Sequence, residues 1–291
     1  MNKHNHLKNA RLSLLGLSIG DAFGDCIQKT TPIFAKTDRY FPECEWIYTD
    51  DTVMAISIYE NLKEFGEINQ NDLAERFKDK FVADPSRMYG MSTVDILLRI
   101  HKGEHWRNLV STIRPGGSFG NGSAMRVAPL GAYFFDDPER AALEAEKSAV
   151  VTHAHPEARA GAIAVALAAC FCSKENGLSD IDLLKKVLEF TPVSNVQDGL
   201  LQAIELFNES VQTVARALGT GGGVSCQDTV PFCVWCAAKN SGNFENALWD
   251  AVQEPGDRDT VCAIVGGIVA SSVADLPEHF IEKCEKLPSN I

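Results

Sequence analysis

Two acidic clusters, far apart in the sequence, contain the residues best suited to chemistry. Residues 49–52 read Thr-Asp-Asp-Thr and residues 257–260 read Asp-Arg-Asp-Thr, each directly ahead of an apolar run. Four aspartates in one place raise one another's pKa, and buried carboxylates need partners. Hard divalent cations take such oxygen ligands, and a pair of them can activate water for hydrolysis. The two clusters therefore predict a paired-metal hydrolytic site.

Helix capping is the alternative interpretation of both clusters. Asp and Thr ahead of an apolar run are ordinary N-cap residues, and either cluster alone is more often a cap than a ligand set. A cap needs only one such residue, whereas each cluster offers two carboxylates and a hydroxyl. Taken as a pair, the clusters favour metal binding over capping.

A glycine-rich loop at residues 114–123 is the second candidate for ligand binding. Glycines let backbone amides crowd around a ligand, and successive N–H groups form nests that bind anions. Composition alone is equally compatible with a flexible turn, and the Lys-Ser/Thr of a phosphate-binding P-loop is missing. A second glycine run, at residues 219–223, is interpreted first as a connecting loop and second as a ligand loop.

The bulk composition excludes several classes of protein. The 291 residues are 45% apolar and 23% charged, as in ordinary globular proteins. A net charge of −12 argues against non-specific binding to nucleic acid or to anionic membranes. The longest nearly apolar stretch, residues 160–172, is shorter than the roughly 20 residues that span a bilayer. Nine cysteines without framework spacing, and no signal-peptide pattern, predict reduced thiols in a cytoplasmic protein.

Helical periodicity dominates the rest of the chain. Apolar residues recur at helical spacing over residues 53–62, and Gly66 is placed to end that helix. Asn71 is a candidate cap for the next helix. The end of the chain, residues 278–291, is predicted to be solvated.

Two later segments are apolar on every side, which predicts helices surrounded by other helices. They are residues 157–172 and 260–273, and in the second Gly266 and Gly267 would allow a neighbouring helix to approach closely. Alternating strand patterns are scarce, and no linker divides the chain. We therefore predict one all-α domain over residues 1–291.

The chain resembles the ADP-ribosylglycohydrolase family, and the resemblance extends over nearly its whole length. The strings that carry it follow the family's order: 16–24 (Gly-Leu-Ser-Ile-Gly-Asp-Ala-Phe-Gly), 48–52, 117–126, 152–153, 228–231 and 256–260. The resemblance implies an all-α fold with two divalent ions, Mg²⁺ or Mn²⁺, in a cleft. It also implies an enzyme that hydrolyses an N- or O-glycosyl bond and releases ADP-ribose from a modified acceptor.

The resemblance also assigns residues to roles. The implied metal ligands are Thr49, Asp50, Asp51, Asp257, Asp259 and Thr260, of which Asp50, Asp51 and Asp259 are the expected catalytic residues. The implied substrate-binding residues are Gly117, Ser118, Phe119, Gly120, Asn121, Gly122, Ser123, Met125, His153 and Gln28. The glycine loop would hold the diphosphate and its ribose, Phe119 the adenosine end, and His153 the distal ribose.

Gln28 is a departure from the family pattern. Many members have a glutamate eight residues after the glycine that matches Gly20, near the attacking water, and glutamine cannot act as a general base. Either a metal-activated hydroxide suffices, another carboxylate such as Asp25 replaces it, or turnover is slow. A second hypothesis is therefore an ADP-ribose-binding protein with little or no turnover. A third is a metallohydrolase acting on another phosphorylated or glycosylated small molecule.

Overall fold

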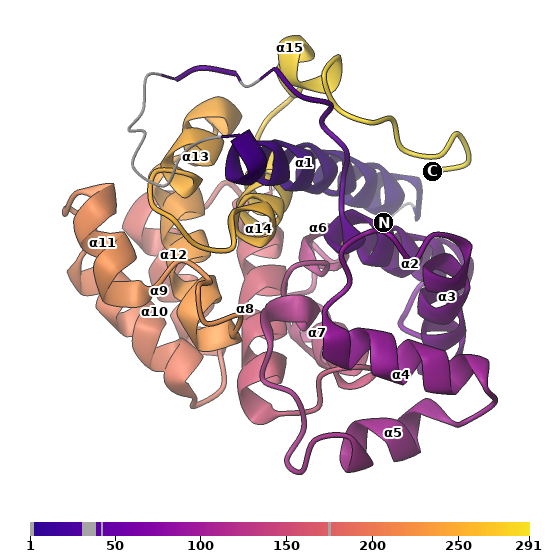
Figure 1. Cartoon of the computed structure of the whole chain (residues 1–291). Helices are drawn as coiled ribbons and strands as arrows, with labels where there is room; N and C mark the ends of the chain where they lie inside the picture. Colours follow the sequence, from indigo (N-terminus) through magenta and orange to yellow (C-terminus); the bar gives the residue numbers. More distant parts are fainter. Residues whose placement is uncertain (1–2, 31–38, 42, 174–175) are drawn as a thin grey trace.

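Helices form nearly all the regular structure of this computed structural model, which describes residues 3–30, 39–41, 43–173 and 176–291 (Figure 1). In chain order they are α1 (Lys3–Thr30), α2 (Asp50–Phe65), α3 (Gln70–Ala83), α4 (Met91–His101), α5 (Trp106–Thr112), the 3₁₀ turn η1 (Asn121–Ser123), α6 (Ala128–Tyr133), α7 (Pro138–Val150), α8 (Pro156–Cys172), α9 (Asp180–Phe190), α10 (Asn195–Glu205), α11 (Val211–Leu218), α12 (Cys226–Lys239), α13 (Phe244–Ala251), α14 (Arg258–Ala270) and α15 (Glu278–Ile281). Within the described ranges, β-pairing is limited to one bridge between Trp46 and Cys284. The predicted all-α fold is confirmed.

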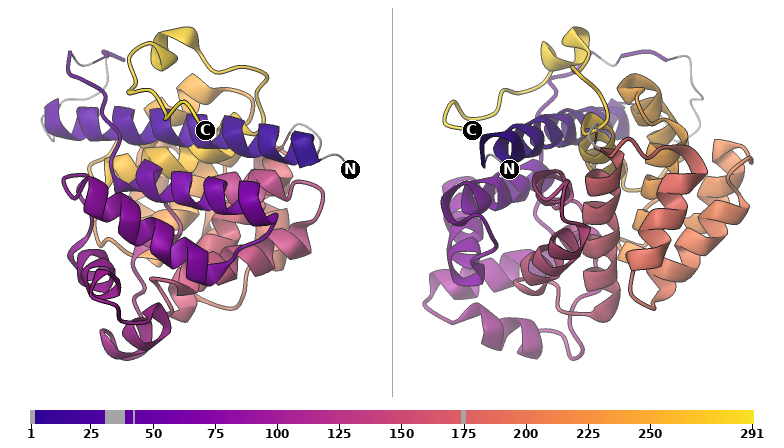
Figure 2. Two further views of the ribbon diagram at one scale, coloured as in Figure 1. Left: turned by 90° about the vertical axis from the view of Figure 1, so that its right-hand side faces the viewer. Right: turned by 180° about the vertical axis from the view of Figure 1, so that it is seen from behind.

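The long helix α1 packs against α14 with backbone touching backbone (Figures 1 and 2). Gly16, Gly20 and Gly24 lie one turn apart on the face of α1 that meets α14. A Cβ atom at Gly20 would collide with the carbonyl of Cys262, and one at Gly24 with the carbonyl of Arg258. Only glycine lets the two helix axes come this close. The contact brings the start of α14 against the last turns of α1.

The predicted helices are confirmed, with small shifts at their ends. Helix α2 ends at Gly66, whose φ of 72° is the left-handed conformation of a C-cap. Helix α8 is buried along nearly its whole length, as predicted for residues 157–172. Gly266 of α14 lies against the backbone of α1, and Gly267 lies against Ala128. Both glycines therefore serve the predicted close approach.

The cap of α3 was predicted wrongly. Asn69, not Asn71, is its N-cap, because the Asn69 side chain accepts a hydrogen bond from Asp72 N at 3.2 Å. Asn71 lies inside the first turn, and its side chain accepts a hydrogen bond from Trp106 Nε1 at 2.9 Å. Two asparagines so close together are equally good caps by residue type.

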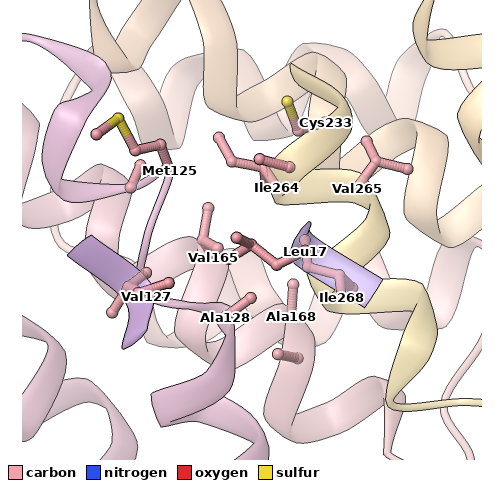
Figure 3. Close-up of a cluster of buried hydrophobic side chains, with 14 of the residues drawn as sticks. Leu17, Met125, Val127, Ala128, Val165, Ala168, Cys233, Ile264, Val265 and Ile268 are labelled. Carbon is pink, nitrogen blue, oxygen red and sulfur yellow. The ribbon is translucent and has the colours of Figure 1, made fainter. Parts of the chain in front are cut away.

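The centre of the core lies where α1, α8 and α14 meet the segment that follows the glycine loop. Figure 3 shows Leu17, Val165 and Ile264 pointing into one cluster with Met125 and Ala128. All five side chains are buried. This packing anchors the end of the glycine loop to the three central helices.

Most residues of the chain's end, 278–291, are exposed as predicted, but the segment is anchored to the domain at particular residues. Phe280 is fully buried, with its ring 5.6 Å from those of Phe23 and Trp46. Glu285 accepts two hydrogen bonds from the guanidinium of Arg87, at 2.7 and 2.9 Å. Burial of an aromatic ring and a bidentate ion pair hold this segment against the domain.

Two further predictions, on the state of the cysteines and on membrane-spanning segments, can be compared with the structure. Cys26 and Cys44 are paired as a disulfide with their Cα atoms 6.4 Å apart, so the prediction of reduced thiols is wrong for this pair. The other seven cysteines are free and buried. Among the described residues, no helix is both long and apolar enough to cross a bilayer. The cytoplasmic location stays a prediction.

The α1–α14 contact predicts the effect of replacing Gly20 with alanine. Alanine is the better helix former by about 1 kcal/mol. Even so, we expect Gly20→Ala to lower the free energy of unfolding by about 1–3 kcal/mol, because the new methyl group is forced into backbone atoms. Urea denaturation measures the change. Gly222→Ala is the matched control, since its Cβ would meet nothing within 4 Å. A Gly20→Ala variant as stable as the wild type would contradict this account of the contact.

Candidate active site

A fully buried carboxylate on α1 organises the start of α2. Asp21 accepts hydrogen bonds from the backbone N–H groups of Thr49 (2.9 Å) and Thr52 (3.1 Å), and from their hydroxyls (2.9 and 2.6 Å). Burial raises the pKa of Asp21 to about 6, and these hydrogen bonds oppose the rise. Asp21 lies in the family string at residues 16–24, but sequence reasoning gave it no role in the site.

Thr49 is the N-cap of α2, and its hydroxyl is already engaged. It donates to Asp21 and accepts from the backbone N–H of Asp51 at 3.3 Å. Thr49 lines a small neighbouring cavity together with Asp25 and Lys29, and not the cavity that holds Asp50. The structure therefore places the hydroxyl of this predicted metal ligand outside the cavity that holds the aspartates, where it caps helix α2.

The remaining predicted metal ligands share one cavity of about 480 Å³. They come from the first turns of α2 and α14 and are Asp50, Asp51, Asp257, Asp259 and Thr260. The two acidic clusters thus meet in space. Both helices present their N-terminal ends, where partial positive charge favours carboxylates.

Three carboxylates of this cavity, those of Asp50, Asp51 and Asp259, are held in an environment that disfavours their charged forms. Burial, and then the charge of Asp21, raise the pKa of Asp50 to about 8. Burial and the neighbouring aspartates also raise the pKa values of Asp51 and Asp259 well above the usual range. Four acidic groups without an added cation therefore destabilise one another here.

The cluster suits a hard divalent cation in donor chemistry and charge. Asp51 Oδ2 and Asp259 Oδ1 are buried and have no hydrogen-bond partner among the described residues. Unsatisfied carboxylate oxygens are the ligands that Mg²⁺ and Mn²⁺ prefer. In the described part of the chain, however, no three His, Cys, Asp or Glu side chains form a ready-made metal cage. The cluster therefore matches a divalent cation in the type of its ligand atoms and in its charge, but the side chains are not arranged around a single point as coordinating ligands would be.

The glycine loop forms the wall beside the carboxylates. Ser118, Phe119, Gly120, Asn121 and Gly122 all line the cavity. Asn121 Nδ2 donates to Asp257 Oδ2 at 2.7 Å, which joins the loop to the second acidic cluster. Phe119 is 42% exposed, and its ring meets His155 edge to face. The loop also continues through Met125, another lining residue, into the core.

Three predicted substrate-binding residues lie outside the lining. Gly117, with φ of 86°, turns the chain where a Cβ would collide with the backbone of His155. The buried hydroxyl of Ser123 donates to Ala158 O at 2.9 Å. Gln28 is exposed, and its Oε1 accepts a hydrogen bond from Arg258 N at 3.1 Å. All three support the surrounding structure in this conformation.

His153 is buried but reaches the cavity. Burial and the charge of Arg126 lower its pKa to about 3, so the ring is neutral at physiological pH. A Cβ atom on Gly122 would lie 3.0 Å from His153 Nε2, and one on Gly120 would lie 3.3 Å away. Glycine at these two positions makes room for the ring.

Sequence reasoning missed a second group of lining residues. They are Met88, Gly90, Met91, Ser92, Thr93 and Val224, whereas Arg114 and Gly223 also line the cavity but belong to the two glycine-rich segments already considered as ligand loops. Most belong to the start of α4 and its preceding loop, where no residue type suggests chemistry. Arg114 opens the glycine loop and offers a positive charge. Gly223 and Val224 belong to or follow the second glycine run, whose interpretation as a ligand loop was the less favoured one.

Residues 2–290 match the ADP-ribosylglycohydrolase family. This chain belongs to that family. Its relatives include an uncharacterized protein of Archaeoglobus fulgidus, 30% identical over 94% of this chain and 90% of the relative. They also include ADP-ribosylhydrolase ARH3 of Homo sapiens, 25% identical over 82% of this chain and 74% of the relative. The resemblance identified from the motifs is therefore confirmed.

The same architecture occurs in a solved structure titled ADP-ribosylglycohydrolase-related protein complex. It aligns with a TM-score of 0.66 and 22% identity, over 97% of this chain and 94% of that one. At this identity the likeness concerns the fold. It agrees with the all-α ADP-ribosylglycohydrolase architecture described above.

The raised pKa of Asp50 predicts a pH-dependent stability in this ADP-ribosylglycohydrolase-family chain when metal is removed. The folded value of about 8 exceeds the unfolded value of 3.8, so the folded state binds this proton more tightly. Its contribution is present below about pH 4 and is lost as the pH rises towards 8. In EDTA, we expect Asp50→Asn to melt at least about 2 °C above the wild type at pH 8, with no gain at pH 4.

Calorimetry over this pH range measures the difference. The exposed Asp182 supplies the control variant, Asp182→Asn, which makes the same substitution at the surface and outside the cavity. A melting difference between Asp50→Asn and wild type that does not change with pH would show that Asp50 is not held protonated by its surroundings.

Proposed function

We propose that this chain is a hydrolase that cleaves an ADP-ribosyl linkage and releases ADP-ribose from a modified acceptor. The observation that carries the proposal is the cavity in which α2 and α14 join two acidic clusters beside a glycine loop. Membership of the ADP-ribosylglycohydrolase family and relatives named ADP-ribosylhydrolase ARH3 support it. A hydrolase of this kind breaks an N- or O-glycosyl bond.

We further propose that two divalent cations, Mg²⁺ or Mn²⁺, are held by Asp50, Asp51, Asp257, Asp259 and Thr260. The unpartnered oxygens of Asp51 and Asp259 and the raised carboxylate pKa values support this assignment. Such cations, when bound, supply positive charge that lowers the pKa of water and stabilises charge developing on the sugar. Asp21 and Asn121 then act from behind, by holding Thr49 and Asp257 in place.

The chain's own residues orient the substrate. Ser118, Gly120 and Asn121 can surround the diphosphate with backbone and side-chain donors, and Arg114 adds the positive charge that a diphosphate attracts. Phe119, partly exposed at the rim, offers a face for the adenosine end. The distal ribose then lies at the carboxylate end of the same cavity. We assign Asp50, Asp51 and Asp259 to orienting water there.

The reaction balances as a simple hydrolysis. The bond between the anomeric carbon and the acceptor atom breaks, and a bond from water oxygen to that carbon forms. One proton of water remains on the ribose hydroxyl, and the other goes to the acceptor. Fixed dipoles and charges in a buried cavity stabilise such a transition state more strongly than water does.

Loss of one carboxylate should abolish turnover. Because even residues behind metal ligands contribute about 10–100-fold, we expect Asp259→Asn to lower kcat/KM by at least about a hundredfold. The assay follows ADP-ribose release from arginine-, serine-, nucleobase- and O-acetyl-linked substrates with Mg²⁺ or Mn²⁺. EDTA should stop the reaction, and added Mn²⁺ should restore it. Asp182→Asn is the matched control. Full activity in EDTA would remove the metal-dependent mechanism.

Gln28 separates the enzyme from a non-catalytic binding protein. Its side chain lies outside the cavity, bonded to the backbone of Arg258, and a glutamate could accept the same hydrogen bond. Because the substitution leaves the cavity lining and this hydrogen bond in place, we expect Gln28→Glu to alter kcat/KM by no more than about threefold, or about 0.7 kcal/mol of activation free energy. The same release assay measures it. A wild type that binds ADP-ribose but releases none, with activity appearing only in Gln28→Glu, would favour the binding protein.

A further inference from the structure

A buried arginine lies behind the glycine loop and forms no salt bridge with a carboxylate of the described residues. Arg126 is fully buried, and its guanidinium stacks over the ring of Phe77 at 4.5 Å. One terminal nitrogen, Nη2, donates to Ser148 O at 3.1 Å and to the hydroxyl of Thr152 at 2.9 Å. Arginine has no acceptor atom, so the Thr152 oxygen must be the acceptor in this contact.

The hydrogen bonds of the Thr152 hydroxyl determine which ring nitrogen of His153 carries the hydrogen. Its hydroxyl oxygen lies 2.7 Å from His153 Nδ1, and the structure gives it no other partner besides Arg126 among the described residues. If His153 Nδ1 carried a hydrogen, Thr152 would accept from both neighbours and its own hydrogen would be buried without an acceptor. Such a buried, unsatisfied donor is destabilising. The hydroxyl therefore donates to a bare Nδ1.

A neutral histidine with a bare Nδ1 carries its hydrogen on Nε2. In His153 this atom has no hydrogen-bond partner among the residues that the structure describes, and the ring lines the cavity. Nε2 lies beside Gly120 and Gly122, within the part of the loop that also lines the cavity. The free donor therefore belongs to a ring in the cavity wall, beside the two glycines of the loop.

We propose that Thr152, oriented by Arg126, is a positioning residue that fixes His153 as the Nε2–H tautomer, so that Nε2 donates a hydrogen bond to an oxygen of the bound ligand. The ligand oxygen is a ribose or phosphate oxygen of ADP-ribose, and this identification rests on the proposed function. The tautomer itself does not. Because the ring is neutral, it acts as a hydrogen-bond donor and not as a cation or a general base through Nε2.

The tautomer is measured directly by NMR on the protein with ¹⁵N-labelled histidine at pH 7, in the presence of Mg²⁺. The His153→Gln variant assigns the resonances. We expect the wild type to show a single state with Nδ1 unprotonated and Nε2 protonated. A wild-type spectrum with Nδ1 protonated would overturn the proposal whatever the activity of the protein.

Thr152→Val removes the hydroxyl at nearly constant shape, and Thr152→Ser keeps it. We expect Thr152→Val to give a mixture of the two neutral tautomers and to weaken ADP-ribose binding about tenfold in calorimetry, since one hydrogen bond loses its fixed donor. Thr152→Ser should restore both readings. Thr191→Val is the matched control, because Thr191 is equally buried and donates only to Val187 O.

The NMR spectrum of His153 and the calorimetric affinity for ADP-ribose together distinguish a failure of this proposal from a failure of the proposed function. A wild type with the Nε2–H tautomer that does not bind ADP-ribose would reject that ligand and leave the tautomer established. A Thr152→Val variant with an unchanged spectrum and unchanged affinity would reject Thr152 as a positioning residue. A melting temperature lowered equally in Thr152→Val and Thr191→Val, with no change in either reading, would assign the hydroxyl a purely structural role.

Discussion

The site depends on the absence of side chains between two helices. Gly16, Gly20 and Gly24 let α1 touch the backbone of α14, and the last of them faces the Cα atom of Asp259. Asp21 projects from the same stretch of α1 to the start of α2. One helix therefore sets the position of both acidic clusters. A larger residue in this stripe would separate the clusters by moving a whole helix, which packed interiors resist.

The buried carboxylate of Asp21 differs from those of Asp51 and Asp259 in how completely its oxygens are hydrogen-bonded. Asp21 has four donors, two each from Thr49 and Thr52, so its burial is compensated. Asp51 and Asp259 each keep one oxygen buried and unpaired. An unpaired buried acceptor is destabilising unless a ligand completes it. The fully bonded Asp21 holds the start of α2 in place, whereas the unpaired oxygens of Asp51 and Asp259 face a shared cavity and would gain most from the proposed cation. Asp25 also keeps one unpaired oxygen, but it lies outside this cavity and is paired with Lys29.

From the sequence, the residue types gathered in the cavity were easier to predict than the full set of residues that line it. The aspartates and the glycine loop, which line one cavity, could be singled out because clustered carboxylates and glycines are unusual in a sequence, and the helices because periodicity is a local property. The disulfide between Cys26 and Cys44 and the docking of Phe280 depend on contacts between distant segments. Met91, 90% exposed at the rim, also has no chemical signature, so only the fold shows that it lines the cavity.

Two residues with strained backbone conformations line the cavity, and hydrogen bonds connect their segments to the two acidic clusters. Met88 and Val224 both line the cavity with positive φ values, 67° and 50°, which is unfavourable for a β-branched residue in particular. Such conformations persist only where the surroundings impose them. Arg87, next to Met88, accepts a hydrogen bond from Asp50 N at 2.7 Å, and Asp257 N donates to the loop that carries Val224 at 3.0 Å. Each strained residue is thus held by backbone bonds to one acidic cluster. The backbone around the cavity opening and the two acidic clusters therefore form one connected unit, and the proposed binding of a cation to the carboxylates would also restrict the shape of the opening.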